Sequence, residues 1–342
     1  MIPGPVRRTL SPGRILVAGL ALAAVTLAVL WLAPSNSYLF LPDRARLVAP
    51  LVKAQGERPP DGRGGIYFVE VIVRRASLLE RLFPSIRGGS TLVPAHALNP
   101  PGTGDRERRE ENRRQMEQSQ QVAAAVALRE LGHEVAATPT GALVAQVLPG
   151  APAAAELRAG DVVVGVDGQP VRTPADLRRL VRRHRPRTTI RLAIRGGRGL
   201  RRALLRTIAD PADRSRAIIG VSVEPDVRIT LPFPVQIDVG HVGGPSAGLA
   251  FALDLMEELG RDVDHGYRVA ATGALELDGT VGPVGAVKQK VLGARREKVD
   301  VFLVPVGENA REARRHAAGL RVVPVKSFRQ ALRVLAALPP KA

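Results

Sequence analysis

The sequence predicts a chain with one N-terminal transmembrane helix, a small mainly-β domain and a C-terminal α/β (α+β) domain. Residues 15–33 form an apolar run of 19 residues without a charge, which is long enough to cross a bilayer as a helix. Residues 141–208 contain Gly-Asp and Asp-Gly turns within residues 157–168 and a strand-like run at residues 188–194. A helix-like run over residues 249–259 and a strand-like run over residues 301–305 indicate a last domain that contains both helices and strands.

The apolar run predicts a single-pass protein of the cell membrane. Arg7, Arg8 and Arg14 precede the run, which places residues 1–14 in the cytoplasm and everything after Ser35 outside. Trp31 is expected at the outer interface of the bilayer. The rival interpretation is a cleaved signal peptide, but its apolar core should be shorter and end in an Ala-x-Ala-like site. The sequence Leu-Ala-Pro-Ser-Asn-Ser after the run is a poor match, so we favour an uncleaved anchor.

Residues 37–131 are predicted to form an N-terminal region with β-like runs and one long helix. The clearest strand covers residues 65–73, and a short helix is expected over residues 77–83. A Pro- and Gly-rich break at residues 99–104 precedes a helix over residues 105–131. The first half of that helix is highly charged, as solvated faces usually are, and we assign it no function.

Composition bounds the chemistry of the chain. Its 342 residues suit two to three domains. It contains no cysteine, which excludes disulfides, a thiol nucleophile and thiolate metal sites, and its histidines show no zinc-ligand spacing. We therefore expect no cofactor and no metal. The net charge of +18 suits nucleic acid or an anionic surface, but no nucleic-acid-binding signature accompanies the scattered arginines. A general preference for arginine is the simplest explanation, and no nucleic-acid partner is expected.

A candidate nucleophile lies in the glycine-rich run Gly-Gly-Pro-Ser-Ala-Gly at residues 243–248. Pro245 suits the first position of a helix because its missing N–H needs no partner there. Ser246 would then lie where free backbone N–H groups point, and the N–H groups around Gly244 to Ala247 could stabilise an oxyanion. A plain capped helix start is the alternative explanation.

A serine nucleophile needs a base, and the lysines supply two candidates. Lysine accounts for only six of the 50 basic residues, and two of the six, Lys288 and Lys290, lie within residues 282–294. A buried lysine can lose its proton near neutral pH, whereas arginine stays protonated. Residues two apart on a helix do not share a face, so only one of the two can meet Ser246.

Residues 218–335 resemble the proteolytic domain of the Lon protease family, and we assign residues 216–338 to this domain. The resemblance rests on the Gly-Pro-Ser-Ala-Gly loop, on Ala-Thr-Gly at 271–273, on the run 278–285 and on the strand at 301–305. It implies a Ser246–Lys290 dyad, with Lys290 followed by Val-Leu-Gly-Ala, and Thr272 orienting the lysine. The chain departs from the family at Gly243 and Ala274, where acidic residues are common.

Residues 141–208 resemble a PDZ domain, to which we assign residues 135–208. The resemblance rests on Arg-Ala-Gly-Asp and Val-Asp-Gly within residues 157–168, a capped helix at 173–181 and a strand at 188–194. It implies that an extended peptide pairs with a sheet edge beside a helix. A clear carboxylate-binding loop is missing, so the nearest residues, Gly141, Ala142 and Leu143, are the candidate peptide contacts. A purely structural PDZ domain is the alternative.

Together these features predict a membrane-anchored serine endopeptidase that hydrolyses envelope or unfolded proteins with help from the PDZ domain. The sequence has no Gly-x-x-x-x-Gly-Lys phosphate loop, so we expect activity without ATP. Peptide and protein substrates are the expected partners, and homo-oligomerisation is left open. A non-catalytic PDZ adaptor and a basic envelope-binding protein are the alternative functions.

Overall fold

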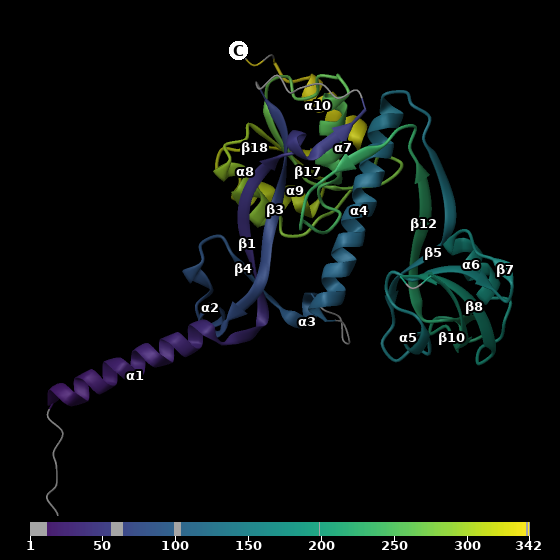
Figure 1. The fold of residues 1–342 in the computed structure, drawn as a ribbon, viewed down its shortest axis with the longest axis horizontal. Coiled ribbons are helices and arrows are strands. Elements are labelled where there is room, and N and C mark those ends of the chain that lie inside the picture. Colours follow the sequence, from purple (N-terminus) through teal and green to yellow (C-terminus); the bar gives the residue numbers. More distant parts are fainter. Residues whose placement is uncertain (1–11, 56–63, 99–103, 198, 340, 342) are drawn as a thin grey trace, which may run out of the picture.

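The computed structural model describes residues 12–55, 64–98, 104–197, 199–339 and 341. Figure 1 shows three parts: a protruding N-terminal helix, a central body of sheet and helices, and a β-rich domain on the far side of a long helix. The predicted cytoplasmic segment lies outside the described residues except for residues 12–14.

The N-terminal helix α1 (Pro12–Leu32) projects away from the body and exposes its apolar side chains. Residues Gly13–Leu32 form a helix long and apolar enough to cross a membrane, and none of its most apolar stretch is buried in the protein. An exposed helix of this composition is unfavourable in water, because each apolar side chain stays hydrated. The helix that the apolar run predicted is therefore present, and it suits a membrane anchor.

The central sheet has six strands in the order β18-β17-β14-β3-β1-β4. Neighbours from β18 to β3 are parallel, whereas β3, β1 and β4 pair antiparallel. The strands are β1 (Pro34–Leu47), β3 (Gly65–Ser77), β4 (Thr91–Pro94), β14 (Arg268–Ala271), β17 (Val301–Pro305) and β18 (Arg321–Val325).

The predicted separation of residues 37–131 from the last domain is therefore wrong. Strand β14 is buried, and its backbone groups need a partner on both edges. Residues Gly65 to Phe68 of β3 supply one of those partners, and β17 supplies the other. The N-terminal strands thus complete the sheet of the C-terminal domain.

Helices cover both faces of this sheet. On one face lie α4 (Asp105–Glu130), α7 (Gly248–Glu258) and α10 (Phe328–Ala336), and on the other lie α8 (Val287–Arg296) and α9 (Glu308–His316). Strand β17 shows the alternation that this requires: Val301 and Leu303 enter the first core, and Phe302 enters the second. A fully buried side chain such as Phe302 contributes about 1.5–3 kcal/mol.

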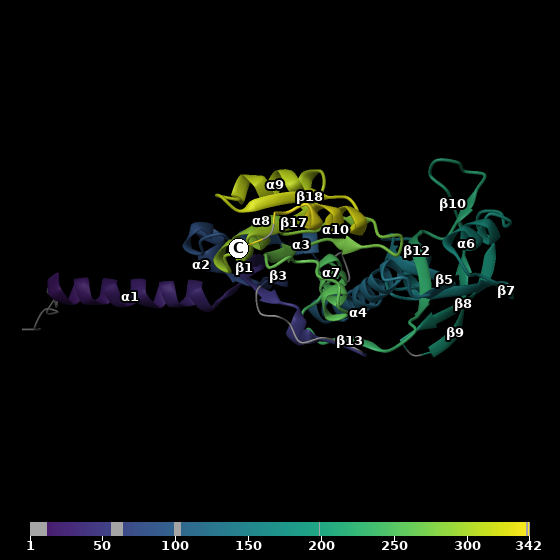
Figure 2. The same cartoon turned by 90° about the horizontal axis from the view of Figure 1, so that it is seen from above.

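Helix α4 is the predicted long helix, and its second half is part of the core. Residues 122–128 are mostly alanine and valine, and all are buried. Small side chains let α4 lie close along α7, so its composition reflects helix packing. In Figures 1 and 2, α4 lies between the central body and the β-rich domain.

The β-rich domain is a sheet in the order β12-β5-β6-β8-β9, with β7 beside β6. Its elements are β5 (Ala136–Val147), α5 (Ala153–Glu156), β6 (Val162–Val166), β7 (Gln169–Pro170), α6 (Pro174–Val181), β8 (Thr189–Gly196), β9 (Gly199–Arg206) and β12 (Val221–Thr230). The predicted boundary at residue 216 is wrong, because β12 pairs with β5 along almost its whole length. The expected linker at residues 209–215 instead turns between β10 (Ile208–Ala209) and β11 (Ala217–Ile218).

Short elements connect these parts. Ser77 and Glu80 form a capping box at the start of α2, where the short helix was expected. Strand β13 pairs with β2, and β15 pairs with β16. Their bounds are β2 (Val52–Ala54), α2 (Leu78–Leu82), α3 (Ala95–Leu98), β13 (Val235–Ile237), β15 (Ala274–Leu275) and β16 (Val281–Gly282), with single 3-10 turns at Ala49–Leu51 and Pro84–Ile86.

Candidate active site

Ser246 and Lys290 meet although 44 residues separate them in the chain. Ser246 lies in the loop before α7, and Lys290 lies on α8. The lysine Nζ is 2.6 Å from the serine Oγ, which is hydrogen-bonding distance. The sequence suggested that Pro245 is the first residue of the helix. Helix α7 instead begins at Gly248, so Pro245 lies in the loop before it.

The surroundings of Lys290 favour a neutral amine. Its side chain is only 4% exposed, and burial lowers its pKa from 10.5 to about 7. Lys288 lies on a different side of α8, where its Nζ donates a hydrogen bond to the Ser90 carbonyl oxygen at 3.1 Å. Of the two lysines, the structure brings only Lys290 to the serine.

Thr272 fixes the direction of the hydrogen bonds around Lys290. Its single hydroxyl proton is directed to the Ser246 carbonyl oxygen, at 3.0 Å. The same oxygen lies 2.9 Å from Lys290 Nζ, so it accepts a hydrogen bond from the amine. The lone pair of a neutral Lys290 is then left for the hydroxyl proton of Ser246.

The backbone around the serine only partly matches the predicted oxyanion site. The Gly244 N–H donates to the Asn112 carbonyl oxygen at 2.8 Å, and Pro245 has no N–H. Within the described residues, the N–H groups of Ser246 and Ala247 donate to no backbone carbonyl. The donors available in this conformation are therefore those of Ser246 and Ala247.

Helix α4 holds the serine loop, which the sequence gave no reason to expect. Besides the contact of Asn112 with Gly244, the Ser119 hydroxyl donates to the Pro245 carbonyl oxygen at 3.1 Å. Ser119 is buried, and a Cβ added at Gly248 would lie 2.8 Å from its Oγ, so the glycine allows this close approach. Asn112 and Ser119 belong to a polar stretch that resembled a solvated helix face.

A second glycine positions the lysine. Helix α8 packs on β1 and β3, and a Cβ added at Gly293 would collide with the Asp43 carbonyl oxygen and approach a methyl group of Val69. Only glycine therefore lets this part of α8 reach the sheet at this depth. Lys290 lies one turn earlier on the same helix, so the packing at Gly293 sets its distance from Ser246.

A cleft of about 840 Å³ opens next to the serine. Its walls are the middle of β3, the first half of α4 and the loop at residues 238–247. Strand β14 ends opposite Phe68, so residues 69–73 of β3 pair with β1 on one edge only within the described sheet. Ile72 and Val73 are exposed there and give the cleft an apolar wall.

The predicted peptide contacts of the β-rich domain are wrong. Gly141, Ala142 and Leu143 lie on β5, which pairs with β12 on one edge and with β6 on the other. A peptide cannot add to a strand whose two edges are already paired. Among the described strands, β12 pairs only with β5, and it lies next to α6, so its outer edge is the position open to a peptide.

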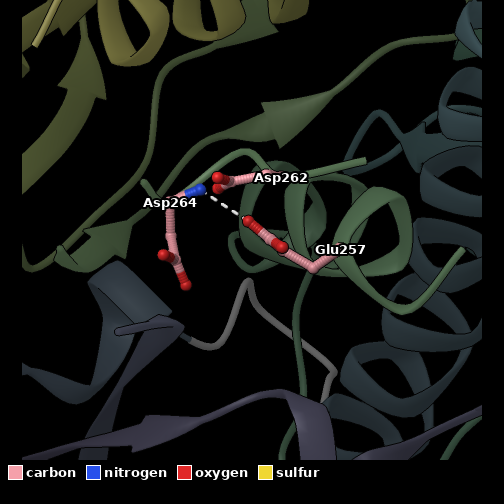
Figure 3. A group of neighbouring side chains, drawn as sticks. All are labelled: Glu257, Asp262 and Asp264. Carbon is pink, nitrogen blue, oxygen red and sulfur yellow. Dashed lines mark hydrogen bonds between the residues drawn. The ribbon is translucent and has the colours of Figure 1, made fainter. Parts of the chain in front are cut away.

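Three carboxylates near the end of α7 have the spacing of a metal site. Oxygen atoms of Glu257, Asp262 and Asp264 lie within 4.8 Å of one another. Glu257 Oε1, however, already accepts the N–H groups of Val263 and Asp264, both at 2.5 Å. Figure 3 shows the Asp264 N–H turned towards Glu257. Burial raises the pKa of Glu257 to about 7, which weakens it as a ligand, so we assign the group to closing the loop after α7.

Comparison with known proteins identifies both domains. Residues 143–195 match the family model of the PDZ domain, and residues 232–336 match that of the Lon protease (S16) C-terminal proteolytic domain. Lon protease 2 of Bacillus subtilis (strain 168) is 30% identical over 116 residues, 34% of this chain and 20% of that protein. The Lon protease of Aquifex aeolicus (strain VF5) is 36% identical over 85 residues, 24% of this chain and 11% of that protein. The aligned region is thus a fifth or less of each relative.

Solved structures similar to about a quarter of this chain include PDZ domains. A PDZ domain of an SdrC-like protein from Listeria monocytogenes is 22% identical with a TM-score of 0.23, covering 25% of this chain and 87% of that chain. A solution structure from Geobacillus thermodenitrificans is 31% identical with a TM-score of 0.23, covering 25% of this chain and 97% of that chain.

The chain therefore contains a proteolytic domain of the Lon family. It joins this domain to a PDZ domain. The resemblances that the sequence indicated are confirmed. The predicted fold class, an α/β proteolytic domain after a mainly-β PDZ domain and an apolar N-terminal helix, is confirmed as well.

Proposed function

We propose that this protein is a membrane-anchored, ATP-independent serine endopeptidase with a Ser246–Lys290 dyad. The observation that carries the proposal is the 2.6 Å approach of a buried lysine amine to a serine hydroxyl beside a cleft. A neutral amine at this distance can take the hydroxyl proton as a general base.

The reaction follows from these contacts. Neutral Lys290 removes the proton from Ser246 Oγ, which attacks the carbonyl carbon of the peptide bond. The N–H groups of Ser246 and Ala247 stabilise the resulting oxyanion. Protonated Lys290 then gives its proton to the leaving amine, and an acyl-enzyme remains. Water, deprotonated by Lys290, hydrolyses the ester and restores the serine hydroxyl.

The cleft favours an extended substrate. The unpaired edge of β3 at residues 69–73 offers backbone N–H and C=O groups to a substrate strand, and Ile72 and Val73 offer apolar contact. A folded protein presents extended segments only in exposed loops or after local unfolding. Unfolded or flexible envelope proteins are therefore the substrate class we propose.

The PDZ domain would bind peptides at the outer edge of β12 and control access to the cleft. Strand β12 ends at Thr230, and the same chain segment continues into the loop that carries Ser246. A peptide held on β12 would thus lie on the segment that leads to the nucleophile. This role does not need a catalytic group in the PDZ domain.

One observation favours the alternative of a non-catalytic PDZ adaptor. The Gly244 N–H is occupied by Asn112, so one expected oxyanion donor is not free in this conformation. An adaptor would bind envelope proteins without turnover. Casein hydrolysis by the membrane-reconstituted full chain separates the two functions.

The test compares four proteins in nucleotide-free buffer: wild type, Ser246→Ala, Lys290→Ala and Lys288→Ala. We expect turnover by the wild type and by Lys288→Ala and none by the other two. Lys288→Ala is the matched control, because it removes a nearby amine from the same helix. Equal turnover by wild type and Ser246→Ala would reject the dyad, and strict dependence on ATP would reject the stand-alone activity.

A further inference from the structure

An exposed apolar loop lies beside the end of α1. Residues 81–88 are all exposed, and they include Leu82, Phe83 and Ile86, which are 61%, 56% and 48% exposed. Three large apolar side chains within five positions make a patch that is unfavourable in water. We call residues 81–88 the interfacial loop.

The structure fixes this loop at the level of the last turns of α1. The Leu78 N–H donates to the Ala33 carbonyl oxygen at 2.9 Å, and α2 contacts α1. Figures 1 and 2 both show α2 next to the C-terminal end of α1. The Arg87 guanidinium lies 5.3 Å from the centre of the Trp31 ring. If Gly13–Leu32 spans a bilayer, the loop lies at the boundary between hydrocarbon and headgroups.

The loop also carries the charge that suits an anionic surface. The loop contains two arginines, Arg81 and Arg87, and no acidic residue, a net charge of +2. Just before the loop, Glu80 is buried and paired with Arg74 and Arg87, so it faces the protein rather than the solvent, and Arg75 is paired with Asp105. Basic residues around apolar side chains are typical of segments that lie in the interface of anionic membranes.

We propose that the interfacial loop is a second membrane contact, in which Leu82, Phe83 and Ile86 insert into the interface of an anionic bilayer beside α1. This inference rests on the anchoring part of the proposed function and is independent of catalysis. One helix alone leaves the body free to tilt and rotate about the anchor. A second contact fixes the orientation of the body against the membrane.

The consequence for the cleft follows from β3. This strand lines the cleft at residues 69–73 and then runs to Ser77, directly before α2. Leu78 lies five positions after Val73, a distance of about 17 Å at the usual rise of a strand. The contact would hold the cleft close to the membrane surface, where segments of membrane-attached proteins are within reach.

The test uses the full chain, which contains no native cysteine and therefore accepts single cysteines for labelling. An environment-sensitive fluorophore is attached at Leu82→Cys, and at Ile86→Cys as a second position, in nanodiscs of phosphatidylcholine with phosphatidylglycerol. Nitroxide lipids report depth. The matched control is Leu204→Cys on β9 of the PDZ domain, because Leu204 is 64% exposed and Leu82 is 61% exposed. Leu22→Cys reports the middle of α1.

We expect shallow nitroxides to quench the labels at residues 82 and 86 more than deep ones do, and neither kind to quench the label at residue 204. Quenching at residues 82 and 86 should weaken in discs of phosphatidylcholine alone. Labels at residues 82 and 86 that behave like the control would overturn the proposal. Equal quenching in both lipid mixtures would reject its anionic part. An unquenched label at residue 22 would show that α1 does not span, and both the anchor and this contact would fall, whatever the protease assay shows.

Discussion

The buried amine of Lys290 should give the protease a characteristic loss of activity in acid. With a pKa of about 7, about half of the amines are neutral at pH 7, whereas with the ordinary value of 10.5 only roughly one in 3,000 would be. If the neutral amine is the base, kcat/KM should fall about tenfold for each pH unit below 7 and reach a plateau above about pH 8. A flexible fluorogenic peptide, assayed from pH 5 to 10, measures the profile.

The same pKa predicts how stability depends on pH. Because the pKa is lowered in the folded protein, the unfolded chain binds more protons between about pH 7 and 10.5, and stability rises with pH over that window. Below pH 7 the cost of keeping the amine buried is roughly 4–5 kcal/mol, at about 1.4 kcal/mol per pKa unit. The Lys290→Met variant removes this cost, but it also loses the hydrogen bonds to Ser246 and Thr272. Each lost hydrogen bond reduces the gain in the free energy of unfolding by about 1 kcal/mol.

Lys290→Met should therefore raise the thermal midpoint at pH 7, and the difference from wild type should shrink as the pH approaches 10.5. Lys288→Met is the control, because the Lys288 amine contacts the Ser90 carbonyl outside the dyad. This variant should leave the pH profiles of activity and of stability unchanged. An acid limb centred above pH 9, or a stability difference for Lys290→Met that does not change with pH, would refute the reasoning.

Three further outcomes are expected. Ser119→Ala should lower kcat about fivefold with little change in KM, because the serine loop loses one hydrogen bond of about 1 kcal/mol; an unchanged kcat would contradict a positioning role. Gly293→Ala should abolish casein turnover and lower the thermal midpoint, because its Cβ would push α8 from the Asp43 carbonyl. Burial and nearby carboxylates hold the pKa of Asp254 well above its usual range. The unfolded chain therefore releases this proton at a lower pH than the folded protein does, and the free energy of unfolding falls as the pH rises. Asp254→Asn should thus raise the thermal midpoint more at pH 8 than at pH 5, and the opposite trend would count against the assignment.

The sequence predicted the local chemistry better than the long-range pairing. Ser246 could be named because its glycine-rich run has a chemical reason, whereas Lys290 and Thr272 were named through the short runs that resemble the Lon family. Helix geometry allowed only one of Lys288 and Lys290 to reach the serine, and the resemblance to the Lon family selected Lys290. The Ser–Lys contact itself depends on how α7 and α8 pack on the sheet, which no short run encodes.

Strand pairing between distant segments explains the errors in the domain boundaries. Strands β3 and β12 look like ordinary short β-like runs, and their partners, β14 and β5, lie far away in the sequence. A strand does not show from its own residues which edge it will complete. The predicted peptide contacts on β5 failed for the same reason, because only the pairing with β12 shows that both edges of β5 are occupied.

The polar half of α4 shows why a charged helix is not necessarily only a solvated face. Its outward side does carry charges, yet its inward side presents the Asn112 carbonyl and the Ser119 hydroxyl to the serine loop. A backbone carbonyl has no sequence signature, and a single serine between glutamines gives none either. The helix that separates the PDZ domain from the body is thus also the helix that contacts the nucleophile's loop. In this conformation α4 accepts the Gly244 N–H, so this helix takes up one of the backbone donors that the sequence placed around the serine.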